Sequence, residues 1–348
     1  MHYNLVDLLG IGNAIVDVIV RVDESFLVAK KLEKGCMRLI DQDTAHALYE
    51  EMGPAIESSG GSVANTVAGI AGLGASAAFI GKLCDDQLGS VFRHDIVATG
   101  AVFHTAPIAA PASACCLVLV TPDGERTMNT FLGANCELGS DDIDEDAVSA
   151  ARIVYLEGYL WDMPKAREAI LKAVRLAHDA GRMVALNLSD PFCVERHRED
   201  FRRLIGDGVD ILLANEAELH SLYATRCLDD ALHNVSRDCA IAAVTLGPRG
   251  CVIVGDGETR SVPAVELEKI VDKTGAGDQF AAGFLFGLIR GQGLKSCGRL
   301  GALAAAEVIS HFGSRPQSSL ADFAHQCLPD LGLSFLTRFL RPKSPKDV

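Results

Sequence analysis

The sequence predicts an α/β fold built on a central, mostly parallel sheet with helices on both faces. Short, continuous apolar runs recur along the 348 residues, and amphipathic stretches separate several of them. Strands that are apolar along their whole length are typical of a parallel sheet buried between two layers of helices. With 49% hydrophobic residues, the chain is also apolar enough to bury a core of that size.

Seven apolar runs are expected to be buried strands. They are VDLLGIG (6–12), ACCLVLV (114–120), RIVYLEG (152–158), MVALNLS (183–189), DILLAN (210–215), IAAVTLG (241–247) and CVIVG (251–255). The clearest helix is expected over 164–181, where Ile170, Val174 and neighbouring apolar residues recur at helical spacing. Residues 264–272, AVELEKIVD, alternate like a strand and precede a second helix, DQFAAGFLFGLIRG.

Residues 18–58 and 102–131 fit this pattern less well, because they mix alternating residues with charges. They predict a small mixed sheet that stands off the main domain, either as a lid over a ligand or as an edge or dimer surface. We therefore expect one domain over 1–340 that contains this lid, followed by a frayed tail at 341–348.

Composition limits the classes of partner. The net charge is −14, and phosphate backbones need clustered cations, so a nucleic-acid surface is not expected. Asp7 and Asp17 interrupt the apolar N-terminus, which predicts neither a signal peptide nor a membrane span. The eleven cysteines are scattered and form no CxxC pair, which favours a reducing cytoplasm. We expect a monomer or homodimer.

Three stretches resemble familiar binding or catalytic motifs, but their surrounding sequence does not support those sites. GIGNAI begins like a dinucleotide fingerprint, but Ile15 replaces the third glycine and a strand follows. GGSVA resembles a nucleophile elbow that ends in Ala64, which leaves a hydrolase using Ser62 as a distant alternative. GKL at 81–83 lacks the hydroxyl residue that follows the lysine of a phosphate loop.

The turn Gly275-Ala276-Gly277 leads directly into Asp278 and the second helix. The first amides of a helix have no intrahelical acceptors, and glycines let the backbone approach a ligand closely. Such a turn suits an anion, and Asp278 suits a base that takes a proton from an attacking hydroxyl. A carboxylate that merely complements the helix dipole is the plainer alternative.

Other polar and glycine residues lie at turns beside the predicted strands. Asn13 and Asp17 flank an apolar strand, where a carboxylate needs partners such as sugar hydroxyls. NEAE (215–218) follows a strand at the edge where open α/β sheets bind ligands, although its asparagine also suits a helix cap. The small residues of GGSVAN (60–65) could bind a ligand or could equally pack against a sheet. A hairpin turn explains the glycines of TLGPRG (245–250) nearly as well as a ligand site does.

In series, GIGNAIVD, GGSVAN, NEAE, TLGPRG, TGAGDQFAAGF and HFGSRP resemble the PfkB, or ribokinase-like, family of carbohydrate and nucleoside kinases. The match spans nearly the whole chain, and its most specific part is the glycine-rich stretch before Asp278. The resemblance implies a ribokinase-like three-layer α/β/α domain with a small β-rich lid, and a kinase that uses ATP and Mg²⁺.

The family's functional residues fall on matching positions here. Asp278 would be the catalytic base, and the 275–277 turn would hold the transferring phosphoryl group. The acceptor would be bound by Asn13, Asp17, Gly60, Gly61, Ser62 and Asn65. The ATP site would include Asn215, Glu218, Thr245, Gly247 and Gly250, with Glu218 arranging water around Mg²⁺. A monovalent cation such as K⁺ would be held by Asp272 and Ser314.

This sequence departs from the family at Lys273, where relatives carry a small hydroxyl residue; we expect that lysine to point to solvent. Residues 26–41, 122–134 and 186–192 most resemble adenosine kinases and their bacterial relatives. An apolar slot for a purine would then involve Met37, Leu39 and Phe131, which core packing of the lid would also use. Transfer of phosphate to adenosine is the leading hypothesis. A ribose or fructose kinase and a non-catalytic nucleoside or sugar sensor are the alternatives.

Overall fold

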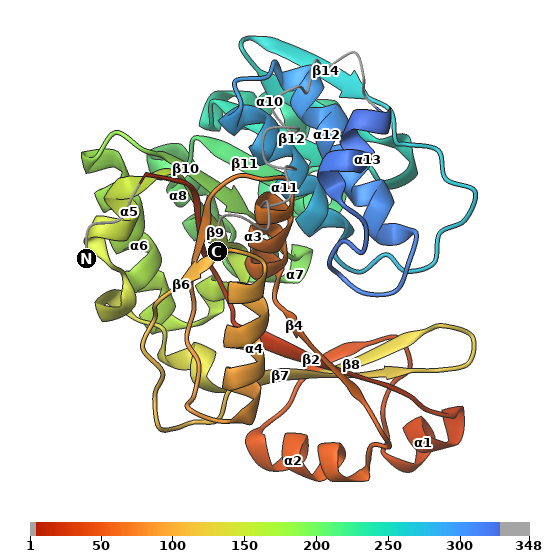
Figure 1. The fold of residues 1–348 in the computed structure, drawn as a ribbon. Coiled ribbons are helices and arrows are strands. Elements are labelled where there is room, and N and C mark those ends of the chain that lie inside the picture. Colours follow the sequence, from red (N-terminus) through yellow and green to blue (C-terminus); the bar gives the residue numbers. More distant parts are fainter. Residues whose placement is uncertain (1–4, 328–348) are drawn as a thin grey trace, which may run out of the picture.

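The computed structural model describes residues 5–327 and shows a large sheet between two layers of helices, with a smaller sheet beside it (Figure 1). The large sheet has nine strands in the order β14-β13-β12-β11-β10-β9-β1-β5-β6. Their bounds are β1 Val6–Ile11, β5 Ala77–Ile80, β6 Val102–Phe103, β9 Ala151–Glu157, β10 Met183–Asn187, β11 Ile211–Asn215, β12 Ile241–Thr245, β13 Cys251–Gly255 and β14 Glu258–Val262. All neighbouring pairs are parallel except those that β13 makes with β12 and β14.

Alternate residues of most of these strands enter two separate cores, which confirms the predicted three-layer α/β/α arrangement. Leu8 packs in one core and Leu9 in the other. The first core is covered by α3 Ser62–Gly72, α4 Gln87–Ala98, α11 Ala276–Ile289, α12 Leu294–Ile309 and α13 Leu320–Cys327. The second is covered by α5 Glu145–Ala150, α6 Pro164–Asp179, α7 Pro191–Arg196, α8 Arg198–Gly208, α9 Glu216–Tyr223 and α10 Leu228–Asp238.

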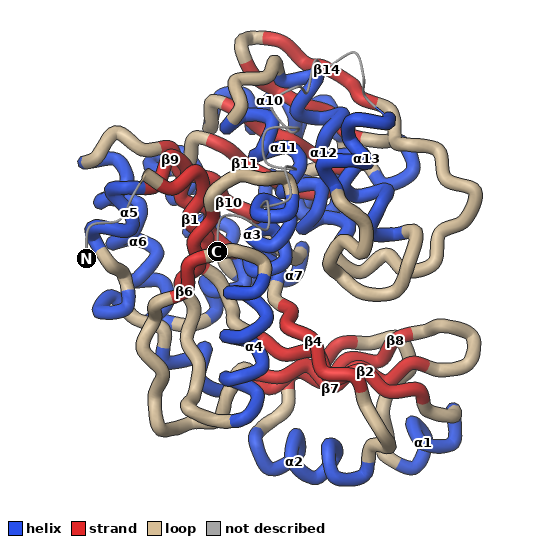
Figure 2. Tube along the Cα trace, viewed as in Figure 1, coloured by secondary structure: helices blue, strands red, loops and turns tan. Residues whose placement is uncertain are grey.

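The smaller sheet stands off the large one and has its own covering helices. Its strand order is β3-β8-β7-β2-β4. The bounds are β2 Ile15–Arg21, β3 Met37–Leu39, β4 Ile56–Gly60, β7 Ala114–Val120 and β8 Arg126–Phe131. Helices α1 Glu24–Ala29 and α2 Gln42–Glu51 lie on the side of this sheet that faces away from the large domain (Figure 2). We call the side covered by α1 and α2 the outer face, and the opposite side the inner face.

One expected boundary and one expected strand were wrong. The second stretch of the small sheet begins at Ala114 rather than at 102, because Val102 and Phe103 pair with β5 at the edge of the large sheet. Residues 264–272 are not a strand. This segment follows the outermost strand β14 and Pro263. It runs to the end of α12, where Val271 N donates to Ile309 O. Their alternation therefore reflects a segment lying across the surface.

Short 3₁₀ turns complete the described fold: η1 Gly133–Glu137, η2 Ser140–Asp142, η3 Gly158–Asp162 and η4 Gly247–Arg249. The expected tail at 341–348 lies outside the described residues. Within residues 5–327, no helix has both the length and the apolar character needed to cross a bilayer. The ten cysteines from Cys36 to Cys297 are all free.

Candidate active site

Asp278 lies in the first turn of α11 and is held by two side chains from α3. Ser62 Oγ donates to Asp278 Oδ1 at 2.7 Å, and Asn65 Nδ2 donates to Asp278 Oδ2 at 2.9 Å. Asn187, at the end of β10, donates in turn to Ser62 Oγ at 3.3 Å. Burial raises the pKa of the Asp278 carboxyl to about 6, while the bonds from Asn65 and Ser62 lower it. An aspartate that titrates near neutrality suits a general base.

The glycine turn ahead of Asp278 has one structural glycine and one that faces open space. Gly275 caps α11 with φ +78°, and a Cβ there would lie 2.5 Å from Ser314 O. A Cβ on Gly277 would meet nothing within 4 Å. Ala276 N donates to Lys273 O at 3.3 Å. The next N–H groups, at the start of α11, border an open space beside the carboxylate, which is the arrangement that an anion needs.

The small sheet reaches this turn through Arg126, a residue that the sequence analysis missed. Arg126 Nη1 donates to Thr274 Oγ1 at 2.8 Å, and Nη2 pairs with Asp272 Oδ2. Asp272 Oδ1 also accepts from Thr274 N and Oγ1, and Oδ2 from Gly313 N. Both carboxylate oxygens of Asp272 are thus already used.

Ser314, the second residue expected at a monovalent-cation site, also already makes a hydrogen bond. Ser314 Oγ donates to Asn65 Oδ1 at 3.3 Å. Among the described residues, no group of three or more His, Cys, Asp or Glu side chains could hold a metal ion. The expectation that Asp272 and Ser314 jointly hold such a cation is not supported by this arrangement, because a guanidinium already neutralises the carboxylate.

Asp17 lies on the inner face of the small sheet, pressed against the Gly60-Gly61 turn. A Cβ on Gly60 would lie 2.5 Å from Asp17 Oδ2, and one on Gly61, whose φ is +94°, would lie 2.3 Å from Asn13 O. Burial raises the pKa of Asp17 to about 7, and nearby Arg126 and Arg315 lower it. The sequence-predicted acceptor residues Asn13, Asp17, Gly60, Gly61, Ser62 and Asn65 are therefore brought together near Asp278.

The residues expected at the ATP site end neighbouring strands of the large sheet. Asn215 and Glu218 form a capping box: Asn215 Oδ1 accepts from Glu218 N at 2.9 Å, and Glu218 Oε2 accepts from Asn215 N at 2.8 Å. Glu218 is 4% exposed, and burial raises its pKa to about 7. Thr245 ends β12 beside Asn215, as the register of the two strands shows.

The two glycines after Thr245 differ in what surrounds them. A Cβ on Gly250 would lie 2.1 Å from Val262 O, so that glycine lets the turn between β12 and β13 pack against the end of β14. A Cβ on Gly247 would meet nothing within 4 Å. Of the two, Gly247 has the open surroundings that a bound nucleotide requires.

Strand register decides which lid side chains share a face with Asp17. Asp17 pairs with Cys116 and Cys116 with Thr130, while Leu39 pairs with Thr130 and Met37 with Met128, so all of these point to the inner face. Met37 and Leu39 are 49% and 60% exposed. Phe131 is one residue further along β8 and points to the outer face, where it packs on the core beneath α1 and α2. Its expected place in a purine slot was wrong.

Comparison with known proteins agrees with this architecture. The model of the pfkB family carbohydrate kinases matches residues 53–320. The chain belongs to the PfkB family.

Solved structures of PfkB kinases superpose closely on the chain. Adenosine kinase from Sinorhizobium meliloti is 52% identical, with a TM-score of 0.87 over 92% of this chain and 99% of that one. A probable sugar kinase from Rhizobium etli CFN 42 is 48% identical, with a TM-score of 0.88 over 95% and 100%. In sequence, adenosine kinase 1 from Arabidopsis thaliana is 26% identical over 330 residues, which cover 88% of this chain and 94% of that protein.

As a PfkB kinase, the chain is a sugar or nucleoside kinase, a phosphotransferase whose acceptor is a hydroxyl group. The hydrolase alternative finds no support in the geometry, because Ser62 contacts a carboxylate and an amide rather than a histidine. Lys273 is exposed, as expected.

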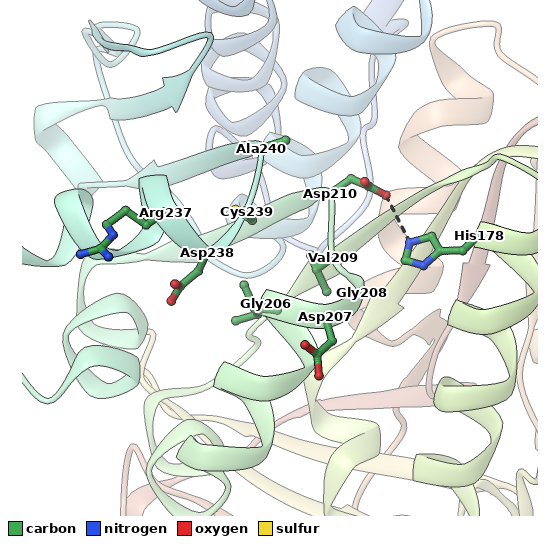
Figure 3. A pocket seen from close by; sticks show the side chains of 11 residues that line it. His178, Gly206, Asp207, Gly208, Val209, Asp210, Arg237, Asp238, Cys239 and Ala240 are labelled. Carbon is green, nitrogen blue, oxygen red and sulfur yellow. Dashed lines mark ion pairs between the residues drawn. The ribbon is translucent and has the colours of Figure 1, made fainter.

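A separate pocket of about 410 Å³ lies away from Asp278, and Figure 3 shows the side chains that line it. His178, Asp210, Arg237 and Cys239 are among its lining residues, and His178 Nε2 lies 3.8 Å from Asp210 Oδ2. Asp210 and Ala240, which also lines the pocket, immediately precede β11 and β12, so this pocket is at the amino ends of the parallel strands. Ligands of open α/β sheets bind at the carboxyl ends. The pocket therefore does not belong to the kinase site.

Proposed function

We propose that this PfkB kinase is an adenosine kinase, which transfers the γ-phosphoryl group of ATP to the 5′-hydroxyl of adenosine. Asp278 accepts the proton of the attacking hydroxyl, and the N–H groups at the start of α11 bind the phosphoryl group as its charge develops. Asn13 and Asp17 bind the ribose hydroxyls. A carboxylate with two oxygens suits a pair of neighbouring hydroxyls.

The nucleotide side of the site fits ATP with Mg²⁺. The open surroundings of Gly277 and Gly247 leave room for phosphate and nucleotide close to the backbone. Glu218 is a buried carboxylate at the carboxyl end of the sheet. Because the described residues form no cage of acidic ligands, Mg²⁺ would be held by phosphates and water, with Glu218 orienting the water. When bound, Mg²⁺ neutralises charge on the transferring phosphate.

One observation favours a nucleoside over a free sugar: the inner face around Asp17 is apolar. Ile19, Val118 and Met128 lie in register across β2, β7 and β8, and Met37 extends the row. A free sugar offers hydroxyls on every side and gains little from such a surface. At about 25 cal/mol per Å², covering roughly 100 Å² of apolar base surface would favour a nucleoside by a few kcal/mol. The 52% identity to an adenosine kinase supports the same choice.

The competing acceptor is a free sugar, which the similarity to a probable sugar kinase favours. Comparing kcat/KM for adenosine, inosine, ribose and fructose, under identical ATP and Mg²⁺, tests the proposal. Adenosine should be used at least tenfold more efficiently than either sugar. If ribose or fructose turns over as efficiently as adenosine, the chain is a sugar kinase. Absence of turnover with every acceptor, together with binding of adenosine, would point to a sensor.

A further inference from the structure

Glu157 is a buried carboxylate at the carboxyl end of β9 that the roles above do not use. Its side chain is 1% exposed and accepts hydrogen bonds from three N–H groups. Asn13 N and Val63 N donate to Oε2 at 3.2 and 3.3 Å, and Asn13 Nδ2 donates to Oε1 at 2.7 Å. Burial raises the pKa of Glu157 to about 7, and these bonds lower it.

The donors come from the two places where the chain passes between the sheets. Asn13 lies between β1 of the large sheet and β2 of the small one, and Val63 lies just after the turn that returns from β4 to α3. A Cβ on Gly12 would lie 2.5 Å from Glu157 Oε2, so the glycine lets the carboxylate reach both crossings. Glu157 thus ties the lid's outgoing and returning strands to one point of the large sheet.

The contacts also fix which way the Asn13 amide faces. Two backbone N–H groups point at Oε2, so this oxygen acts as an acceptor. Oε1 accepts as well, and the atom of Asn13 that faces it at 2.7 Å is the nitrogen of the NH₂ group. The amide oxygen is consequently turned away from Glu157. That oxygen is buried and has no hydrogen-bond partner among the described residues. A buried acceptor without a partner is costly, unless a ligand supplies the donor.

We infer that Glu157 is a positioning residue: by holding the NH₂ of Asn13, it presents the Asn13 amide oxygen to a hydroxyl of the acceptor. This inference rests on the proposed kinase function and on the acceptor-binding role of Asn13. It does not depend on whether the acceptor is a nucleoside or a sugar, because either one brings hydroxyl donors.

A swap of the two side chains tests the inference. In Glu157→Gln, the two backbone N–H groups retain the glutamine oxygen, so its NH₂ faces Asn13. The Asn13 amide must then turn over and present its own NH₂ to the acceptor. We expect KM for the acceptor to rise roughly tenfold, the cost of losing one or two hydrogen bonds, with KM for ATP within about twofold of wild type.

The double variant Glu157→Gln/Asn13→Asp restores the original polarity. One oxygen of the new aspartate accepts from the NH₂ of the introduced glutamine, and the other faces the acceptor as the amide oxygen did. Its KM for the acceptor should return to within about threefold of wild type. Asn13→Asp alone places two carboxylates against each other, so it should be worse than the double variant. Glu168→Gln, at an exposed glutamate of α6, is the matched control and should leave every constant unchanged.

The readout is KM for whichever acceptor the wild type uses best, so rejection of adenosine would overturn the proposed function without affecting this test. A double variant that binds ATP normally but is no better than Glu157→Gln overturns the inference. If the double variant does not fold, Asn13→Ala decides instead. Adding Glu157→Gln to Asn13→Ala should leave the KM for the acceptor unchanged, and a further tenfold rise would show that Glu157 acts independently of Asn13.

Discussion

Nδ2 of Asn65 lies 2.9 Å from Oδ2 of Asp278, although the two residues are 213 positions apart in sequence. Ser314 Oγ and Arg315 Nε both approach Oδ1 of the same asparagine, at 3.3 and 3.4 Å. These two donors keep the Asn65 oxygen away from Asp278 and its NH₂ toward it. The orientation of Asp278 is therefore set by two other segments of the chain.

Asp278→Asn should lower kcat about 10²–10⁴-fold, the usual contribution of a general base. The amide retains the shape of the side chain but cannot take the proton of the attacking hydroxyl at neutral pH. KM for the acceptor should change little. Steady-state kinetics checks this, with Asp278→Glu as a companion that keeps the carboxylate. Turnover like that of the wild type in the asparagine variant would remove Asp278 from the chemistry.

Gly277→Val should abolish activity in a folded protein. A Cβ at this position meets no protein atom within 4 Å, and its φ is not positive, so only a ligand has to give way. Gly275→Val is the contrasting variant: it adds strain at φ +78° and a clash with Ser314, and should lower the melting temperature as well. Unchanged kcat/KM for ATP in Gly277→Val would mean that no phosphate lies against the turn.

Asp17→Ala should weaken a ribonucleoside more than its 2′-deoxy analogue. Hydrogen bonds to a charged group contribute about 1.5–3 kcal/mol, and the analogue has already lost one of the two hydroxyls. We expect the ratio of KM values for adenosine and 2′-deoxyadenosine to approach one in the variant. Equal losses for both compounds would assign Asp17 a structural role.

Arg126→Met should destabilise the protein through Asp272, whose side chain is 5% exposed and pairs with the guanidinium. Removing one partner of a buried pair costs about 3–5 kcal/mol, because the remaining charge is left unpaired. Urea unfolding should show this loss, and Arg126→Met/Asp272→Asn should recover part of it. Full stability in the single variant would show that the pair does not form in solution.

Stability should fall as pH rises from about 5.5 to 7.5. The folded-state pKa is raised to about 7 for Asp17, Glu157 and Glu218 and to about 6 for Asp278, above model values of 3.8 for aspartate and 4.5 for glutamate. In this window the folded state therefore holds protons that the unfolded state has already released. That contribution to stability is complete below pH 4 and is lost as pH rises through 7.

Urea unfolding at pH 5.5, 6.5 and 7.5 measures this slope. Glu218→Gln removes one of the four groups and should flatten it, while Glu168→Gln, at an exposed position, should leave it unchanged. A free energy of unfolding that rises with pH over the same range would contradict the raised pKa values.

Local patterns predicted the seven apolar strands and the glycine turns, although not the structure of residues 264–272, because those elements depend on neighbouring residues. The small residues before Asp278 and the apolar strands could be identified directly in the sequence. Phe131 could not be placed, because the face it occupies depends on the register between β7 and β8, and a shift of one residue reverses every side chain.

Arg126 and Glu157 were missed for different reasons. Arg126 follows a polar turn and its partner Asp272 is 146 residues away, so nothing local distinguishes it from a surface arginine. Glu157 did carry a signal: it is a glutamate directly after the apolar run RIVYL, at the carboxyl end of a strand. The same reasoning had already selected Asn215.

The contacts between Asp278 and α3 bear on how the enzyme forms during synthesis. Ser62 and Asn65 emerge early, but their carboxylate partner follows 216 and 213 residues later. A nascent chain that ends before α11 lacks Asp278, the proposed base, and with it the partner of two α3 side chains. Contacts this distant in sequence carry a large loop-closure cost and form late in folding. Phosphoryl transfer should therefore require a chain that extends through α11, and we expect partly translated or C-terminally clipped forms that end before α11 to be inactive.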